Sequence, residues 1–550
     1  LMEARALVGE RVARARLPAI ARPPVLLSPL SSTSRVLKVA MWSETRSQME
    51  LTDLVRWVVR PRLMSVPGVA NVAIWGERNR QLQVQVDPVR TQAYGLTLDE
   101  VVLASRQAVT PLPGGFVDGP NQRLAVAEVA EVDTAAALAG QPVAVRNGTA
   151  LTIGEVAEVV EGDAPLIGDA VIDGGQGLLL IVEKQPWGNT LEITREIDAA
   201  LAELAPGLPG VELDAHIFRT ARFIERAVDN LELALALGCV LVILVLAVFL
   251  FDWRSALISA LAIPVSLLSA ILILDQLGLT LDTMVLAGLA IALGEVVDDA
   301  IIDVENIHRR LDENRRRERP RPSAWVVLEA SLEVRSAVVY ASVIVILVFV
   351  PVALLGGLAG AFFRPLAIAY VLAIASSLAV ALTLTPALAL MLIPAGLARS
   401  RPESTARLPR ALARAYAPLL ARLLARPRLV LGATALTLLL GAFGFSRLGT
   451  GFLPDFREQD FLMHWIAKPG ASIEGVRRTT ERVSAELLAI PGVRNSGAHI
   501  GRAEVADEIV GGNFGEIWVS VDDDADHEAT VAAIEETIAR YPGLYRDVQT

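Results

Sequence analysis

The chain has 550 residues, of which 53% are hydrophobic and 20% charged, and its formal net charge is −11 at pH 7. This balance predicts a membrane protein with sizeable soluble parts, and the acidic charge argues against nucleic acid as a partner. Its one cysteine, Cys239, excludes an intrachain disulfide and a cysteine-based metal site. The sequence contains no GxxxxGK[ST] motif, which argues against ATP bound to this chain as an energy source, and its histidines show no HExxH spacing. We expect neither enzyme activity nor a resident cofactor.

The soluble parts repeat one phrase, an amphipathic helix followed by Pro-Gly and then a strand. Four copies occur, at Leu54–Gly76, Ile197–Ile217, Val483–Gly501 and Ile534–Val548. Because Pro-Gly ends a helix and turns the chain, the phrase predicts βαβ ferredoxin-like subdomains. Between the first two copies, a stretch with many glycines, prolines and short strands predicts a β-rich insertion.

Six apolar stretches are long enough to cross about 30 Å of hydrocarbon. They are Leu231–Phe251, Ser255–Leu274, Thr283–Ile307, Ser336–Leu355, Leu366–Ile393 and Leu429–Ser446. The connections at 309–321 and 394–428 are rich in arginine, whereas the alternate connections are nearly free of it. By the positive-inside rule these loops are cytoplasmic, which places both soluble regions on the far side of the membrane.

The third apolar stretch carries acids that do not suit a lipid-facing helix. Glu295, Asp298, Asp299 and Asn306 share a face at ~100° per residue, below the small residues Gly288 and Ala292. Each central carboxylate costs roughly 2.5–3.5 kcal/mol on insertion scales, which offsets most of what the apolar residues contribute. We therefore expect this helix, with these acids buried, inside a bundle.

Three interpretations of these acids are open. The first is a proton relay, because a carboxyl group in a dry site has a raised pKa and can bind and release a proton. The second is a structural polar contact between helices, and the third is a buried helix of a soluble domain. Asp303 and Glu305, near Asn306, are polar residues of the helix end in each interpretation.

The segment GEVVDDAIIDVENIHRRL, from Gly294 to Leu311, resembles the fourth-helix signature of the resistance-nodulation-division (RND) efflux transporters. The resemblance implies that Asp298 and Asp299 form the proton relay. Glu295 and Asp303 stand where the family usually has apolar residues, and we include Glu295 in the predicted relay. Other segments, such as PVALLGGLAGAFFRPLA and GTGFLPDFREQDFL, resemble sequence segments of this family and occur in the same order.

The resemblance implies an α+β membrane protein, a transmembrane bundle with periplasmic porter subdomains and a docking insertion. It divides the chain into a remnant of a first porter subdomain (1–34), a porter subdomain in two parts (35–95 and 174–228) and the docking-type insertion (96–173). Five spans (229–394), an arginine-rich amphipathic linker (395–428), a sixth span (429–448) and a second porter subdomain (449–550) follow. Compared with the family, the chain is predicted to be truncated at both ends, without the helix that carries the relay's lysine.

The predicted function is proton-driven efflux across the bacterial inner membrane by a homotrimer, with a periplasmic adaptor and an outer-membrane channel as partners. The alternatives are an inactive or regulatory truncated homologue and, more remotely, an intramembrane aspartyl protease, which needs facing carboxylates on two helices.

The sequence does not decide between metal ions and organic compounds as cargo, although its overall resemblance favours the heavy-metal branch of the family. Copper and silver pumps of that branch place a thioether just before a Pro-Gly turn, where this chain has His464 with Met463 beside it. Neighbours on a strand point to opposite faces, so these two cannot serve one metal site.

Overall fold

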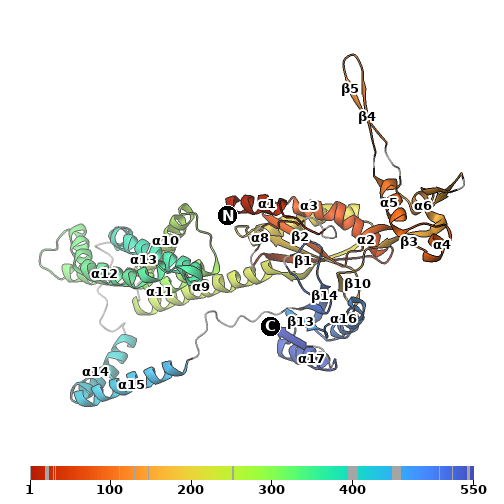
Figure 1. Cartoon of the computed structure of the whole chain (residues 1–550). Coiled ribbons are helices and arrows are strands. Elements are labelled where there is room, and N and C mark those ends of the chain that lie inside the picture. Colours follow the sequence, from red (N-terminus) through yellow and green to blue (C-terminus); the bar gives the residue numbers. More distant parts are fainter. Residues whose placement is uncertain are drawn as a thin grey trace. The chain divides into compact units, whose positions relative to one another are not determined.

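The structure is a computed structural model that forms two compact units, Leu1–Ala221 with Asp455–Thr550 and Arg222–Pro454. It describes residues 2–18, 24–28, 30, 33–110, 112–128, 132–146, 148–250, 253–393, 407–448, 460–506, 508–522, 524–541 and 545–549. The first unit is built on β-sheets and the second on helices (Figure 1).

The first unit contains a four-stranded antiparallel sheet with the order β12-β1-β11-β2. Its strands are β1 (Arg35–Trp42), β2 (Val69–Trp75), β11 (Leu178–Lys184) and β12 (Glu212–Arg219). The β1–β2 connection runs through α2 (Gln48–Leu54), a π-helical turn η1 (Val55–Val59) and α3 (Arg60–Met64), and α8 (Thr190–Leu204) with η2 (Ala205–Gly207) connects β11 to β12. A capping box of Ser47 and Glu50 begins α2.

A second sheet has the order β10-β9-β14-β15-β13-β16. Its C-terminal strands are β13 (Phe461–Ile466), β14 (Val493–Gly501), β15 (Phe514–Val521) and β16 (Tyr545–Gln549), with α16 (Ile473–Leu488) and α17 (His527–Ala539) as crossovers. The short strands β9 (Gly168–Ile172) and β10 (Gly175–Gln176) extend this sheet beyond β14.

The predicted helix-turn-strand phrases are confirmed where the structure describes them. Gly68, Gly210 and Gly492 have φ of 87°, 75° and 91°, so each turns the chain in the left-handed region that glycine accepts readily. The Pro-Gly of the fourth copy lies outside the described residues, between α17 and β16.

The two sheets pack face to face, with helices on their outer faces. Leu37 and Val39 of β1 pack with Ile197 of α8, whereas Ala40 on the opposite face of β1 packs with Trp518 of β15. The second sheet buries Met463 and Trp465 against α16 and α17. This alternation leaves a layer between the sheets in which any polar side chain is removed from water.

A smaller lobe begins with β3 (Arg80–Val86) and ends with its antiparallel partner β8 (Ala157–Asp163). The lobe also contains α4 (Pro88–Ala93), α5 (Leu98–Val109), β4 (Leu112–Asp118), β5 (Arg123–Glu128), α6 (Ala135–Ala139), β6 (Pro142–Arg146), β7 (Thr149–Thr152) and α7 (Ile153–Val156). The hairpin β4–β5 projects from it (Figure 1). These bounds correct the predicted insertion at 96–173, because β3 pairs with β8 and β9 belongs to the second sheet.

The helical unit contains α9 (Thr220–Leu250), α10 (Trp253–Gln276), α11 (Thr283–Arg315), α12 (Ser323–Ala353), α13 (Gly357–Leu392), α14 (Arg407–Leu424) and α15 (Pro427–Arg447). A helix lies at each of the six predicted spans. Among the described residues four helices are long and apolar enough to cross a membrane, α10, α12, α13 and α15, and so the six-span bundle stays a prediction.

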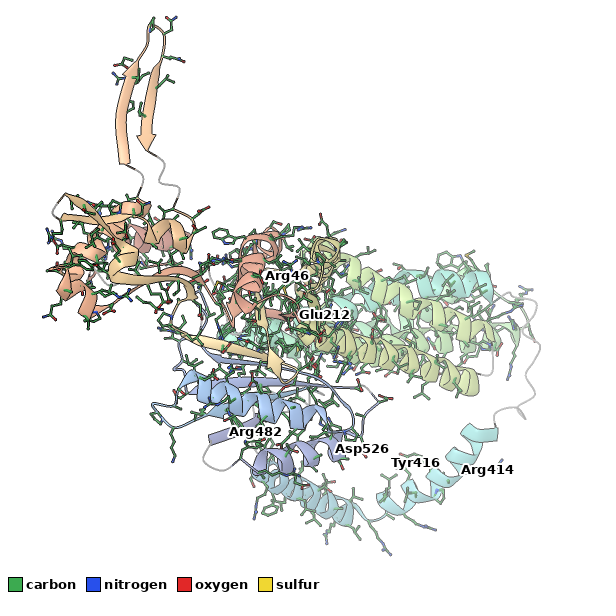
Figure 2. The ribbon with its side chains drawn as sticks, turned by 90° about the vertical axis from the view of Figure 1, so that its right-hand side faces the viewer. Arg46, Glu212, Arg414, Tyr416, Arg482 and Asp526 are labelled. Carbon is green, nitrogen blue, oxygen red and sulfur yellow. The ribbon has the colours of Figure 1, made fainter. Side chains whose placement is uncertain are left out.

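The first unit begins with a further helix, α1 (Met2–Ala13). On α14, the arginine-rich helix of the predicted linker, the side chains of Arg414 and Tyr416 are exposed (Figure 2).

Candidate functional site

Helix α11 begins where Asp282 accepts a hydrogen bond from the backbone N–H of Val285 at 2.8 Å. Its upper part packs tightly on α13, because a Cβ atom added at Gly288 would lie 2.5 Å from the carbonyl oxygen of Leu366. Ala292 is fully buried. The predicted close approach of a neighbouring helix at these small residues is therefore present.

The acids of α11 are not equally buried. Glu295, Asp298 and Glu305 are exposed, whereas Asp303 and Asn306 are buried. The side chain of Asp299 lies outside the part of the chain that the structure describes. The expected burial of Glu295 and Asp298 is thus wrong for this chain.

The physical reason is the arrangement of neighbouring helices around α11. Helices α10, α12 and α13 pack on α11 and cover its Leu289 and Val304 sides. They leave open a stripe at helical spacing that includes Ile291, Asp298 and Ile302. Two carboxylates of the predicted relay therefore lie on an uncovered apolar surface of the helical unit.

Within the described residues, neither Glu295 nor Asp298 forms an ion pair with an arginine or a lysine. The arginines at the end of α11 pair elsewhere: Arg309 lies 3.1 Å from Glu313, and Arg310 lies 2.6 Å from Glu333 on α12. The acids of the stripe therefore carry no compensating charge in the described bundle.

Asn306 instead joins α11 to α12. Its side-chain amide donates to the backbone carbonyl of Ala330 at 2.7 Å, and Asp303 is buried one turn before it. The second carboxylate oxygen of Asp303 has no partner among the described residues. A structural polar contact between helices therefore fits Asn306, whereas Asp303 is buried with one oxygen unsatisfied.

A second group of charges lies between the two sheets of the first unit, and we call it the inter-sheet cluster: Arg35, Lys38, His499, Glu508 and Glu516. The Lys38 ammonium donates to Oε1 of Glu516 at 2.8 Å, and the indole N–H of Trp518 donates to the same oxygen at 2.6 Å. Lys38 also lies 4.1 Å from the centre of the Trp518 ring. Both Lys38 and His499 are fully buried.

The cluster has strongly perturbed ionisation. Burial lowers the pKa of Lys38 to about 8, although the neighbouring Glu516 opposes this shift. Burial alone would raise the pKa of Glu508, but the hydrogen bond and charge of His499 lower it to about 2. Lys38 and His499 likewise outweigh burial and hold the pKa of Glu516 well below its usual range. Both carboxylates are therefore ionised at neutral pH.

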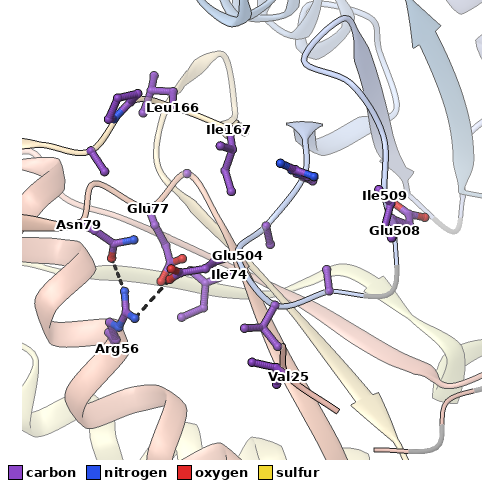
Figure 3. Close-up of a pocket in the computed structure, with 18 of the residues that line it drawn as sticks. Val25, Arg56, Ile74, Glu77, Asn79, Leu166, Ile167, Glu504, Glu508 and Ile509 are labelled. Atoms are coloured by element: carbon purple, nitrogen blue, oxygen red, sulfur yellow. Dashed lines mark hydrogen bonds and ion pairs between the residues drawn. The ribbon is translucent and has the colours of Figure 1, made fainter. Parts of the chain in front are cut away.

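A cavity of about 830 Å³ adjoins the cluster and includes Glu508 in its lining. Arg56 reaches into it from the π-helical turn, contacts Asn79 and forms an ion pair with Glu504 at 3.2 Å (Figure 3). Burial raises the pKa of Glu77 to about 7, because the charge of Arg56 only partly offsets it and Glu504 adds to it. The cavity thus contains a carboxyl group that titrates near neutral pH.

The two residues of the predicted metal site lie on opposite faces of β13. Met463 is fully buried in the core against α16 and α17, so it is a packing residue. His464 is partly buried, with Nε2 3.7 Å from Oε2 of Glu516 and its ring beside Phe514. Of the two, His464 alone borders the inter-sheet cluster.

Sequence reasoning missed Lys38, His499, Glu508 and Glu516. For three of them a signal existed, because each lies inside a strand with many apolar or small residues: RVLKVAMW, VRNSGAHIG and FGEIWVSV. A charged residue at one position of such a strand indicates a buried polar contact. Glu508 lies in a loop, and no pattern in the sequence marks it.

Comparison with known proteins agrees with this architecture. The sequence matches the AcrB/AcrD/AcrF family over residues 1–549. It is 30% identical over 482 residues to the cation efflux system protein CusA of Escherichia coli K12, covering 84% of this chain and 44% of the relative. It is 31% identical over 342 residues to the multidrug resistance protein MdtC of Pectobacterium atrosepticum, covering 61% of this chain and 32% of the relative.

A crystal structure of a heavy metal efflux pump has the same fold, with a TM-score of 0.82 and 24% sequence identity, covering 99% of this chain and 53% of that chain. The chain spans about half the length of the relatives it matches. The resemblance carried by the α11 signature is thereby confirmed: the chain belongs to the AcrB/AcrD/AcrF family of RND efflux transporters.

Proposed function

We propose that the chain is part of a proton-driven exporter in the bacterial inner membrane, with Asp298 and Asp299 as the proton relay and Glu295 beside them. The observation that carries this proposal is the open stripe of α11, which places ionisable carboxyl groups beside uncovered apolar residues such as Ile291 and Ile302, without a compensating charge in the described bundle. Intramembrane carboxyl groups of this kind are costly unless they have a function.

The proposed mechanism uses the charge of the stripe as a switch. When a carboxylate binds a proton it loses its charge, so its apolar neighbours can pack against another helix at lower cost. When it releases the proton, that packing becomes unfavourable and the helix favours a second arrangement. Two arrangements that differ in proton affinity suffice to couple proton flow to transport.

The soluble unit supplies the porter in this proposal. The order β12-β1-β11-β2 recurs in the C-terminal strands as β16-β13-β15-β14, so both halves have the strand order of a split βαβ subdomain. The lobe between β3 and β8 is the docking insertion, and its hairpin β4–β5 exposes Phe116 and Leu124. We place these elements in the periplasm of a homotrimer that binds an adaptor and an outer-membrane channel.

For the cargo we favour metal ions over organic compounds. CusA is named as a cation efflux protein and MdtC as a multidrug resistance protein, so the relatives alone leave both open. The specific observation in favour of metal ions is that His464 approaches Glu516 at the edge of a cluster with nitrogen and oxygen donors.

Export from cells that carry the full-length transporter tests the proposal. We expect Zn(II) or Co(II) export to depend on the proton gradient and to stop when a protonophore abolishes that gradient. Undiminished export after the gradient has collapsed would exclude proton coupling. Export of organic cations alone would keep the mechanism and overturn the cargo assignment.

A further inference from the structure

His499, Glu508 and Glu516 together have the donors of a divalent-cation site. One ligand atom from each lies within 4.8 Å of the others. His499 comes from β14 and Glu516 from β15, so neighbouring strands fix two of the three residues. Nitrogen and carboxylate ligands without thiolates suit Zn(II) and Co(II) rather than Cu(I).

His499 and Glu508 already share one contact of the site. Nε2 of His499 lies 3.2 Å from Oε2 of Glu508, so an ion held by both atoms would replace this hydrogen bond. The other ring nitrogen, Nδ1, is fully buried, has no hydrogen-bond partner among the described residues and lies 4.0 Å from Oε1 of Glu516. A buried ring nitrogen without a partner is unfavourable, so the present contacts of the cluster leave one polar atom unsatisfied.

Lys38 occupies one of the oxygen atoms that a metal ion would need. Its Nζ donates to Oε1 of Glu516 at 2.8 Å, so this oxygen cannot bind an ion at roughly 2.0–2.2 Å while the ammonium remains there. Arg35 lies 3.6 Å from the same oxygen, so two cations already balance the two carboxylates. A divalent ion added to this arrangement would leave an excess of buried positive charge.

Lys38 is one of few lysines in this chain. Lysine occurs at only three positions, 38, 184 and 468, although lysine and arginine together number 50. An ammonium group on a flexible stem can leave a carboxylate more easily than the planar guanidinium of arginine, which binds carboxylates in a fixed geometry. Lysine is therefore the basic residue suited to a contact that must break.

We propose that His499, Glu508 and Glu516 bind a divalent ion such as Zn(II) or Co(II), and that Lys38 is a resident cation that must leave Glu516 before the ion binds. The cavity lined by Glu508 gives the ion access. A role for this site in binding ions during export rests on the proposed function. Binding itself does not require transport and can be measured separately.

The test compares Zn(II) binding to the purified chain in detergent by isothermal titration calorimetry, with Co(II) absorption as a second reporter of ligands. Removing the Lys38 ammonium in Lys38→Met should tighten binding by about 10- to 100-fold, because a buried like charge near the ion is lost. Lys184→Met is the matched control, since Lys184 donates to the carbonyl of Gly188 instead, and it should leave the affinity unchanged. If Lys38→Met does not fold, Lys38→Gln replaces it.

The ligands are tested in the Lys38→Met background. His499→Gln and Glu508→Gln should each remove the gain in affinity and change the Co(II) spectrum. Unchanged or weaker Zn(II) binding in folded Lys38→Met, or tight binding that survives His499→Gln, would overturn the proposal. Proton-coupled export by the full-length transporter alongside such a result would show that only the site is wrong.

Discussion

The acids of α11 and the acids of the inter-sheet cluster differ in what compensates their charge. Glu516 is in contact with Lys38, Arg35 and Trp518, and its pKa lies well below the usual range. Asp298 is exposed between Ile291 and Ile302 on the uncovered stripe of α11, and no described arginine or lysine pairs with it. The carboxylate of Glu516 is held by cations and joins two sheets, whereas that of Asp298 has no such contacts and is the one we propose for the relay.

The largest effect is expected at the relay itself. In the full-length transporter, Asp298→Asn and Asp299→Asn should each abolish export at a normal membrane level, because neither amide can exchange a proton. Export and membrane level are measured in the same cells. Glu305→Gln, an exposed acid of the same helix, is the control and should keep export. Full export in both Asn variants would remove the relay assignment.

A substitution in the inter-sheet cluster should lower the stability of the first unit. Glu516→Gln leaves the fully buried Lys38 without its partner, which should reduce the free energy of unfolding by about 3–5 kcal/mol. Chemical unfolding of the first unit, followed by tryptophan fluorescence, measures this loss. Glu161→Gln breaks an exposed ion pair with Arg80 and should change stability little. Equal stabilities of the two variants would contradict the contrast between compensated and exposed acids.

Glu77 offers a test of pH dependence at the cavity. Its pKa is raised to about 7 from 4.5, so the folded protein retains a proton that the unfolded chain releases between these values. Ionised Glu77 therefore destabilises the fold above pH 7, and this cost disappears as the pH falls towards 4.5.

Glu77→Gln should accordingly raise the free energy of unfolding by about 1–3 kcal/mol at pH 8 and leave it unchanged at pH 4. Unfolding curves at the two pH values measure the difference. The exposed Glu158 provides the control substitution, Glu158→Gln, for which we expect no gain at pH 8. A gain for Glu77→Gln of the same size at both pH values would rule out titration as its cause.

The smallest effect is expected at Glu295. The family usually has an apolar residue at this position, so Glu295→Gln should lower export only several-fold. This corresponds to an increase of about 1 kcal/mol in the activation free energy. Initial rates of export at equal membrane level measure it. If Glu295→Gln is as inactive as Asp298→Asn, the relay in this chain includes a third essential carboxyl group.

Local signals predicted much of this fold. The Pro-Gly turns located three helix-strand junctions, and apolar stretches located the helices of the second unit, because turn chemistry and hydropathy are properties of neighbouring residues. The boundaries of the inserted lobe were wrong because they depend on the pairing of β3 with β8, which are about 70 residues apart. The burial of Asp303 and the exposure of Asp298 depend on which helices pack on α11, and periodicity alone does not decide that.

The inter-sheet cluster shows the same limit at a site. Lys38 and Glu516 are 478 residues apart in sequence, and each lies in a strand with many apolar residues. Only the packing of the two sheets brings them together with His499. The signature of α11, by contrast, places its acids within one helix, so a resemblance of eighteen residues was enough to suggest the relay.

The central claim is that protons pass through the Asp pair of α11, and proton flux in reconstituted vesicles tests it most directly. With the full-length transporter and a pH-sensitive dye, we predict that adding Zn(II) or Co(II) as cargo drives proton movement opposite to the cargo. The same vesicles with Asp298→Asn should bind cargo but move no protons. Cargo-driven proton movement of equal rate in Asp298→Asn and Asp299→Asn would contradict the account.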